Sequence, residues 1–417
     1  MPVLGFEYKC GQLHCEDVPL AEIAERVGTP CYVYSAGAIL NNYDAYAGAC
    51  LHAPFTVHYS VKANSSLGVL SLLARRGAGF DIVSGGELFR VLQAGGDSER
   101  IVFSGVGKTA DEIDYALGAG IAVFNCESEA EVELVNQRAT RRGVRASIAL
   151  RVNPDVGVET HPFIATGLRE HKFGIDIAEA EELYCRAARM EHLSVEGVSC
   201  HIGSQIFDVQ AFVEALRKIL ALVERLRRRG IPIRRLNLGG GLGVGYRRQD
   251  AAPAIGDYMQ ALSQELAGKD LDLMVEPGRS IVAQAGVLLS TVLYRKRSAA
   301  KEFVIVDAAM NDLIRPALYE SYHDIIAVKP SQGPPVKADI VGPVCETGDF
   351  FARDREITPV APGDLLVLCT AGAYGFALSS NYNSRPRAAE VLVQASGFTV
   401  IRDRETYADL IRGERAV

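Results

Sequence analysis

The segment Phe55-Thr-Val-His-Tyr-Ser-Val-Lys62 alternates apolar and polar residues with the two-residue period of a β-strand. One face carries the apolar residues Phe55, Val57, Tyr59 and Val61, and the other carries Thr56, His58, Ser60 and Lys62. The apolar face is suited to packing under helices, and the polar face suits the interior of a closed barrel. The segment therefore predicts an inward-facing strand that ends in a lysine.

Further apolar runs follow this one, and amphipathic helical stretches separate them. The strand candidates are residues 55–61, 79–83, 101–104, 121–125, 147–152, 196–202, 236–239 and 271–276. One helical face is especially clear, since it repeats Phe212, Leu216, Ile219, Leu220, Val223 and Leu226 before a stop at Gly230. This alternation predicts an α/β fold, a TIM-like (β/α)8 barrel, over residues 36–278.

Past Pro277 the pattern changes to short β-rich runs that lack regular helices between them. These runs cover residues 286–293, 303–306, 338–341, 365–369, 389–393 and 398–402. The run at residues 30–34 precedes the barrel, and we expect it to join the same sheet. The sequence thus predicts a second, β-rich domain of sandwich or barrel type, comprising residues 1–35 and 279–417, that completes the active site.

The composition narrows the class of protein. At 417 residues the chain exceeds the size at which a single core usually stops growing, about 300 residues, so two domains are expected. A net charge of -7 gives no basic surface for a nucleic-acid partner, and no apolar run approaches a membrane span. The nine cysteines are odd in number and scattered, which favours free thiols in a reducing cytoplasm and no metal cluster.

Ionisable residues end several strand candidates. The same two-residue parity directs Lys62, Asp81, Arg151, His201 and Glu276 toward the barrel interior at the carboxyl ends of their strands. Active sites of such barrels are built at that end. One polar residue at a strand end is usually just solvated, but five on different strands indicate a shared cavity.

These groups suit chemistry with an aldehyde cofactor. A lysine in a cavity can form a Schiff base with pyridoxal phosphate. Glu276 could face the pyridine nitrogen and keep it protonated, and His201 could lie flat against the ring. The glycine run 239–243 follows the seventh strand and allows backbone N–H groups to approach a phosphate.

A second glycine-rich segment imitates a nucleotide site. Ser104-Gly-Val-Gly-Lys-Thr109 resembles a P-loop, but Val102 stands where that motif requires glycine. Gly105 to Ala110 also fits a loose dinucleotide fingerprint, yet no complete dinucleotide-binding half accompanies it. We therefore set the nucleotide interpretation aside.

Taken in order, these motifs resemble the pyridoxal-phosphate-dependent decarboxylases of the alanine-racemase-like fold. The resemblance is carried by Tyr59-Ser-Val-Lys-Ala-Asn64, Phe80-Asp-Ile-Val-Ser-Gly-Gly-Glu87, His201-Ile-Gly-Ser-Gln205, the glycine run and Glu276-Pro-Gly-Arg279. Residues 151–155, 166–174, 310–319 and 345–349 are similar to the diaminopimelate decarboxylases in particular.

The resemblance implies a role for each site residue. Lys62 would attach the cofactor, Glu276 would partner its ring nitrogen and His201 would stack on its ring. The wider cofactor site would include Asp81, Arg151, Ser204, Gly240, Gly241, Gly278, Arg279 and Tyr374. The substrate would be bound by Arg279, Arg315, Tyr319, Glu346 and Tyr374. Cys345 would be the proton donor and would reach the active site of the neighbouring subunit in a homodimer.

The charges of these residues agree with a substrate that ends in an amino acid. Arginines bind a carboxylate in a fork geometry, and Glu346 suits an ammonium group. We therefore predict decarboxylation of meso-2,6-diaminopimelate to L-lysine and CO2, the final step of lysine biosynthesis. The alternatives are a same-fold decarboxylase of carboxynorspermidine or a carrier-bound amino acid, and an inactive homologue that binds a protein partner. A racemase fits less well, because its chemistry favours an arginine at the position of Glu276.

Residues 155–170, with Pro154, Gly157 and Pro162, suggest a lid.

Overall fold

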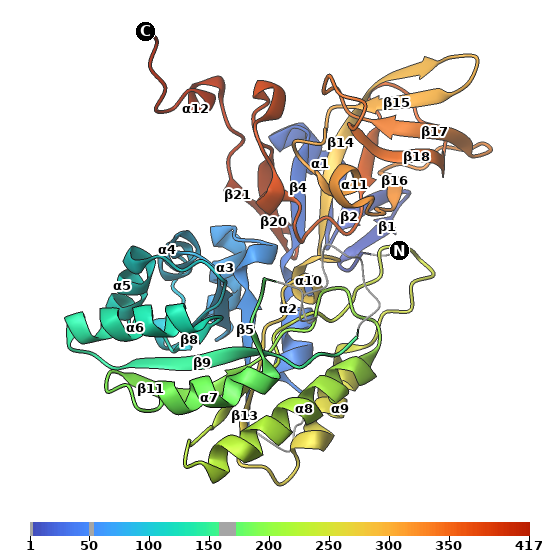
Figure 1. Cartoon of the computed structure of the whole chain (residues 1–417). Coiled ribbons are helices and arrows are strands. Elements are labelled where there is room, and N and C mark those ends of the chain that lie inside the picture. The colour runs from blue at the N-terminus through green and yellow to red at the C-terminus, as the bar shows by residue number, and fades with distance from the viewer. Residues whose placement is uncertain (1–2, 50–53, 158–171) are drawn as a thin grey trace. The chain divides into compact units, whose positions relative to one another are not determined.

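The computed structural model describes residues 3–49, 54–157 and 172–417, and the chain divides into two compact units (Figure 1). The barrel unit comprises Asn42–Val244 and Ala251–Ser280. The sheet unit comprises Met1–Asn41, Gly245–Asp250 and Ile281–Val417. Most of the expected lid lies outside the described residues, which resume at Lys172.

The barrel unit contains a closed ring of parallel strands, which confirms the predicted TIM-like barrel. The ring runs in the order β5, β6, β7, β8, β9, β11, β12, β13, and the pairing of β13 with β5 closes it. The strands are β5 (Phe55–Ser60), β6 (Gly79–Ile82), β7 (Ile101–Phe103), β8 (Val123–Cys126), β9 (Ala146–Asn153), β11 (Leu193–Ser199), β12 (Arg235–Asn237) and β13 (Asp272–Val275). The short β10 (Ile175–Asp176) pairs with the end of β9.

Helices alternate with these strands along the chain. They are α3 (Leu67–Arg75), α4 (Gly85–Gln93), α5 (Ala110–Ala119), α6 (Glu129–Arg142), α7 (Ile177–Ala187), α8 (Val209–Arg228) and α9 (Ile255–Leu266), with short 3-10 turns η1 (Val61–Ala63) and η2 (Ser98–Arg100). In sequence, α2 (Ala36–Ala47) and α10 (Arg279–Val282) cross the boundaries between the units. The predicted helical stripe is confirmed in α8, where Phe212, Leu216, Ile219, Leu220, Val223 and Leu226 are all buried.

The barrel interior is packed beneath its mouth. Val102, Val123, Ala149 and Met274 come from β7, β8, β9 and β13 and form one buried cluster. Inward-facing residues of alternate strands fill such barrels in layers, so the interior is a core and not a pore. This packing leaves the carboxyl ends of the strands as the place where polar side chains can gather.

The sheet unit is built on a mixed sheet that joins the two ends of the chain. Its strands are β4 (Cys31–Ser35), β14 (Gly286–Arg297), β15 (Glu302–Val306), β16 (Ile325–Ala327), β17 (Val336–Val341), β18 (Phe350–Ile357), β19 (Leu365–Leu368), β20 (Ala389–Gln394) and β21 (Gly397–Arg402). The expectation that residues 30–34 join this sheet is confirmed, because β4 pairs with both β14 and β20.

Smaller elements complete the sheet unit. A three-stranded sheet contains β1 (Phe6–Lys9), β2 (Gln12–Cys15) and β3 (Val18–Pro19). The helical elements are α1 (Leu20–Val27), α11 (Arg315–Tyr319), α12 (Tyr407–Leu410), η4 (Phe376–Leu378) and η5 (Tyr382–Ser384). The cysteines within the described residues are all free thiols, and no helix in this part of the chain is long and apolar enough to cross a membrane.

Candidate active site

Lys62 lies at the mouth of the barrel, just beyond the strand that it was predicted to end. Strand β5 ends at Ser60, and Lys62 belongs to the 3-10 turn η1 that follows. Its Nζ donates to Asp81 Oδ2 at 2.6 Å, and Asp81 is fully buried at the end of β6. Strand β5 is thus one residue shorter than predicted. Both residues of this ion pair are among those predicted to point into the barrel.

Asp81 is held as a carboxylate by the groups around it. Burial opposes ionisation, but the Lys62 ammonium and hydrogen bonds from Lys62, Ser60 and Ser104 together lower the pKa of Asp81. Ser60 Oγ lies 2.8 Å from Asp81 Oδ2 and 2.9 Å from the backbone oxygen of Glu276. The serine therefore connects the first and last strands of the barrel at the mouth.

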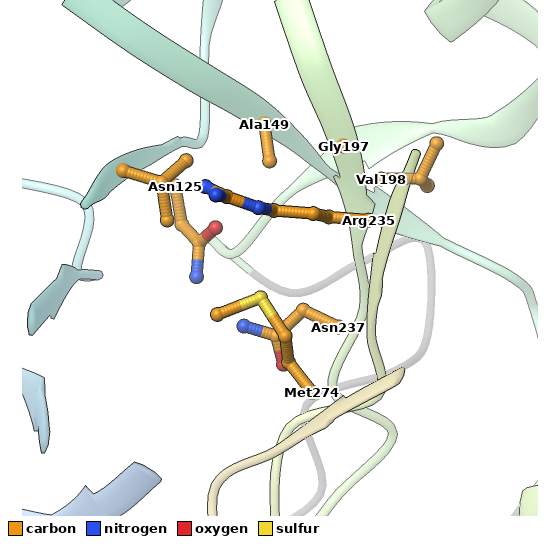
Figure 2. Close-up of a pocket in the computed structure, with 8 residues that line it drawn as sticks. Asn125, Ala149, Gly197, Val198, Arg235, Asn237 and Met274 are labelled. Carbon is orange, nitrogen blue, oxygen red and sulfur yellow. The ribbon is translucent and has the colours of Figure 1, made fainter. Parts of the chain in front are cut away.

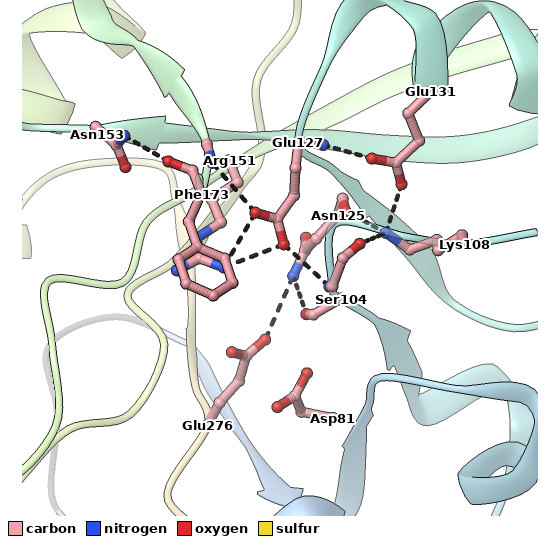
Figure 3. Close-up of polar contacts among 12 residues, drawn as sticks. Asp81, Ser104, Lys108, Asn125, Glu127, Glu131, Arg151, Asn153, Phe173 and Glu276 are labelled. Atoms are coloured by element: carbon pink, nitrogen blue, oxygen red, sulfur yellow. Dashed lines mark hydrogen bonds and ion pairs between the residues drawn. The ribbon is translucent and has the colours of Figure 1, made fainter. Parts of the chain in front are cut away.

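Glu276 directly follows β13 and is buried. Its Oε1 accepts a hydrogen bond from Asn237 Nδ2 at 2.5 Å. It also accepts a longer one from Asn125 Nδ2 at 3.4 Å (Figure 3). Burial, followed by the negative charge of Asp81, raises the pKa of Glu276 to about 8. The positive charges of Lys62 and Arg151 and the hydrogen bond from Asn237 act against this rise, but burial and Asp81 outweigh them.

His201 follows β11 and carries a neutral imidazole. Burial first, and then the positive charges of Arg151 and Lys62, lower the pKa of His201 to about 3. The backbone of Gly239 approaches it so closely that an added Cβ would lie 2.7 Å from His201 Nδ1. A flat, uncharged ring held by a glycine loop suits stacking on an aromatic cofactor.

Three loops converge around small residues at the mouth. An added Cβ at Gly240 would lie 2.3 Å from the backbone oxygen of Glu276, and one at Gly241 would lie 2.3 Å from that of Gly203. Gly278 is equally confined, since its Cβ would lie 2.9 Å from Ser60 Cβ. These positions require glycine so that the loops after β11, β12 and β13 can pack together.

Two polar side chains join this cluster of loops. Arg279 Nη2 donates to Ser204 Oγ at 3.1 Å, and both residues lie in the barrel unit. A guanidinium and a hydroxyl beside glycine backbone are suited to a phosphate group. Lys62, His201 and Glu276 follow strands β5, β11 and β13 of the same barrel. Together with Arg279 and Ser204 they form a set of groups that fits pyridoxal phosphate.

Arg151 makes an ion pair that the sequence did not predict. Its Nη1 lies 3.1 Å and 3.2 Å from the two carboxylate oxygens of Glu127, and its guanidinium lies 4.9 Å from the centre of the Phe173 ring. Glu127 also accepts the backbone N–H groups of Gly105 and Gly174 (Figure 3). Through Glu127, Arg151 is therefore connected to the loops that contain Gly105 and Gly174.

The glycine-rich segment that imitates a P-loop is a structural loop. Lys108 Nζ donates to the backbone oxygens of Gly105 and Asn125 at 2.8 Å and to Glu131 at 2.5 Å. Thr109 then caps α5 through a reciprocal box with Glu112. Lys108 thus donates to backbone and to Glu131 within its own loop region, which supports a structural role for this segment.

A small cavity lies inside the barrel and is lined by two of the amides just described (Figure 2). Its lining residues are Val123, Asn125, Ala149, Gly197, Val198, Arg235, Asn237 and Met274. The space for the centre of a water molecule is about 10 Å³, close to the minimum for a single water. Asn125 and Asn237 were missed from the sequence, although each lies at or near the end of a predicted strand.

Four of the residues predicted in the sheet unit form two local groups, Cys345 with Glu346 and Arg315 with Tyr319. The backbone N–H of the exposed Cys345 donates to Asn383 Oδ1 at 3.1 Å, and Tyr382 Oη donates to Glu346 Oε2 at 2.7 Å. The hydrogen bond to Glu346 raises the pKa of Tyr382.

The second group surrounds a buried cation. Arg315 begins α11, and its guanidinium lies 5.3 Å from the centre of the Tyr246 ring and donates to Ser321 Oγ at 3.2 Å. Tyr319 ends the same helix. Tyr374 lies elsewhere in the unit, with a left-handed backbone at φ 55°. The roles predicted for these residues remain predictions.

Comparisons with known proteins agree with this chemistry. Residues 37–283 match the family model described as pyridoxal-dependent decarboxylase, pyridoxal binding domain. The diaminopimelate decarboxylase of Pseudomonas aeruginosa is 56% identical over 98% of both chains, and that of Neisseria meningitidis serogroup A is 50% identical over 97% of this chain and 99% of the relative.

Solved structures show the same likeness. Diaminopimelate decarboxylase from Helicobacter pylori, complexed with L-lysine, has a TM-score of 0.91 and 41% identity, covering 94% of this chain and 98% of that one. The enzyme from M. jannaschii in complex with L-lysine has a TM-score of 0.95 and 40% identity over 100% of this chain and 99% of its own.

Proposed function

Because this chain belongs to the diaminopimelate decarboxylase family of pyridoxal-dependent decarboxylases, we propose that its barrel mouth converts meso-2,6-diaminopimelate to L-lysine and CO2. This is the final step of lysine biosynthesis. The observation that carries the proposal is the ion pair of Lys62 with the buried Asp81 in the same barrel mouth as the buried Glu276. These are the groups that an aldehyde cofactor and its ring nitrogen require.

Pyridoxal phosphate, when bound, supplies a ring that accepts the electron pair left behind by departing CO2. Lys62 provides the amine that holds the cofactor aldehyde, and Asp81 orients that amine. Glu276 would face the ring nitrogen and keep that nitrogen protonated. His201 offers a neutral flat face, and Ser204 and Arg279 with Gly240, Gly241 and Gly278 bind the phosphate.

Recognition of the substrate is assigned to charged residues of matching chemistry. Arg279, Arg315 and Tyr319 would bind the distal carboxylate, Glu346 the distal ammonium, and Tyr374 would close over the cofactor phosphate. A guanidinium together with a carboxylate matches a zwitterionic terminus better than the terminal cation of lysine or ornithine. The family resemblance supports this assignment residue by residue.

Cys345 would return a proton to the carbon that has lost CO2, acting in the active site of the partner subunit of a homodimer. Its thiol is exposed in the chain, as a group that serves another subunit must be. We also propose that the protein acts in the cytoplasm, because its cysteines are scattered and unpaired in the described residues.

The test is to identify the product. Purified protein with pyridoxal phosphate should convert meso-diaminopimelate to lysine and CO2 in equal amounts, with carboxynorspermidine left unchanged. Lys62→Ala should abolish both turnover and the visible absorption band of bound cofactor. Lys337→Ala, at an exposed lysine on β17 that pairs with Asp354, is the matched control and should behave as wild type. Consumption of carboxynorspermidine without lysine formation would reject the proposed substrate.

A further inference from the structure

Asn237 is held in one orientation by the backbone next to it. The N–H of Gly239 donates to Asn237 Oδ1 at 2.8 Å. A backbone N–H can only donate, so the amide must turn its oxygen toward Gly239 and its Nδ2 in the other direction. Nδ2 then lies 2.5 Å from Glu276 Oε1, so the amide is a fixed donor to that oxygen.

This contact makes the two oxygens of Glu276 different. Within the described residues, the side-chain hydrogen bonds of Glu276 all go to Oε1, from Asn237 and from Asn125 at 3.4 Å. An oxygen that already accepts N–H donors is a poor place for the acid proton. The proton of Glu276 is therefore directed to Oε2.

We propose that Asn237 is a positioning residue that fixes Glu276 so that Oε2 is presented to the ring nitrogen of the cofactor. By donating to Oε1, Asn237 stabilises the carboxylate form of Glu276, which leaves the shared proton on the ring nitrogen. The inference rests on the proposed role of Glu276 as the ring-nitrogen partner. It adds a residue that acts through Glu276 and does not itself contact the cofactor.

The charges around Glu276 show why such a donor is needed. Burial and the negative charge of Asp81 both raise the pKa of Glu276, and so favour a neutral acid that would withdraw the proton from the ring. The positive charges of Lys62 and Arg151 and the hydrogen bond from Asn237 act in the opposite direction. Of these, Asn237 is the group in direct contact with the carboxyl oxygen.

The experiment uses holoenzyme loaded with pyridoxal phosphate that carries 15N at the ring nitrogen, and measures the 15N chemical shift of that atom. In Asn237→Leu, which has nearly the same shape but no donor, the shift should move toward that of an unprotonated pyridine. Loss of one hydrogen bond to a charged group corresponds to about a tenfold change in the ratio of protonated to unprotonated ring. kcat should fall about as much, with KM little changed.

Further variants separate positioning from structural support. Asn153→Leu is the matched control, because this buried amide donates to the backbone oxygen of Phe173 instead, and its 15N shift should equal that of wild type. Asn237→Ser retains an oxygen that can accept the Gly239 N–H but stops one bond short of Nδ2, so it should move the shift even where Asn237→Leu folds poorly.

Each result has one meaning. If Asn237→Ser and Asn237→Leu both keep the wild-type 15N shift while Glu276→Gln changes it, Asn237 does not position Glu276 and the inference is wrong. If Glu276→Gln also leaves the shift unchanged, the proposed role of Glu276 itself fails. A change in the Asn237 variants and in Glu276→Gln, but not in Asn153→Leu, supports both.

Discussion

Glu276 shows how a single buried acid can oppose folding. Its carboxyl group is buried next to Asp81, and its pKa is raised to about 8 from an ordinary 4.5. Below pH 4.5 the group is protonated in both the folded and the unfolded chain. As the pH rises toward 8, the unfolded chain releases its proton while the folded chain retains it, so stability from this group is progressively lost.

Replacing Glu276 with glutamine should remove this pH dependence from the cofactor-free protein. At about 1.4 kcal/mol per pKa unit, the free energy of unfolding of Glu276→Gln should exceed that of wild type by a few kcal/mol at pH 8, and the gap should shrink toward pH 5. Urea unfolding at several pH values measures this gap. Glu133→Gln, at an exposed position on α6, is the control, and a gap of equal size at every pH would contradict the expectation.

Cys345 provides a second prediction for a single residue. If it donates the proton to the product, Cys345→Ala should lower kcat by at least about tenfold and leave the absorption band of bound cofactor in place. The comparison is with Cys10→Ala, because Cys10 is also an exposed free thiol. Equal rates in the two variants would assign the proton to another group.

At the scale of elements, the core stripe of α8 supports the barrel from outside. Leu216 is fully buried on this helix, while Arg228 on the same helix is exposed. Leu216→Ala should lower the free energy of unfolding by about 2 to 5 kcal/mol, because it leaves a cavity in the packed face. Arg228→Ala should change it by less than about 0.5 kcal/mol. Denaturant unfolding of both variants makes the comparison, and equal losses would show that α8 is not packed as described.

The loop after β12 gives a prediction about the cofactor. Gly240→Ala would place a Cβ 2.3 Å from the backbone oxygen of Glu276, so the loops must move apart. We expect the affinity for pyridoxal phosphate to fall by at least about tenfold, measured by absorbance titration. Gly107→Ala meets no atom within 4 Å and is the matched control. Retention of full affinity in Gly240→Ala would show that these loops do not form the cofactor site.

The barrel strands could be predicted from the sequence because their two-residue period and the helical period between them are local properties. Their ends were less certain, since a strand ends where its ladder of hydrogen bonds stops, and that depends on the neighbouring strand. For this reason Lys62 was placed on a strand and lies in a turn. Asn125 and Asn237 were missed because their partner, Glu276, lies far away in the sequence.

At the scale of the whole molecule, the proposed homodimer can be tested by combining two inactive forms. Equal amounts of Lys62→Ala and Cys345→Ala subunits, allowed to exchange, should form hybrids in half of the dimers. If Cys345 serves the partner's site, one site of each hybrid contains both residues, so about a quarter of wild-type activity should return. Activity no greater than that of the separate variants would mean that each site uses its own Cys345.

The pairing of β4 with β14 and β20 has a consequence for the order in which the protein can be made. Cys31–Ser35 is synthesised before any part of the barrel unit, yet both of its partner strands come after Ser280. On the ribosome, the barrel strands can therefore find one another while this early strand is still unpaired. Until β14 and β20 have been synthesised, this extended, apolar segment can associate with the wrong partners. We expect a chaperone that binds nascent chains to protect it during that time.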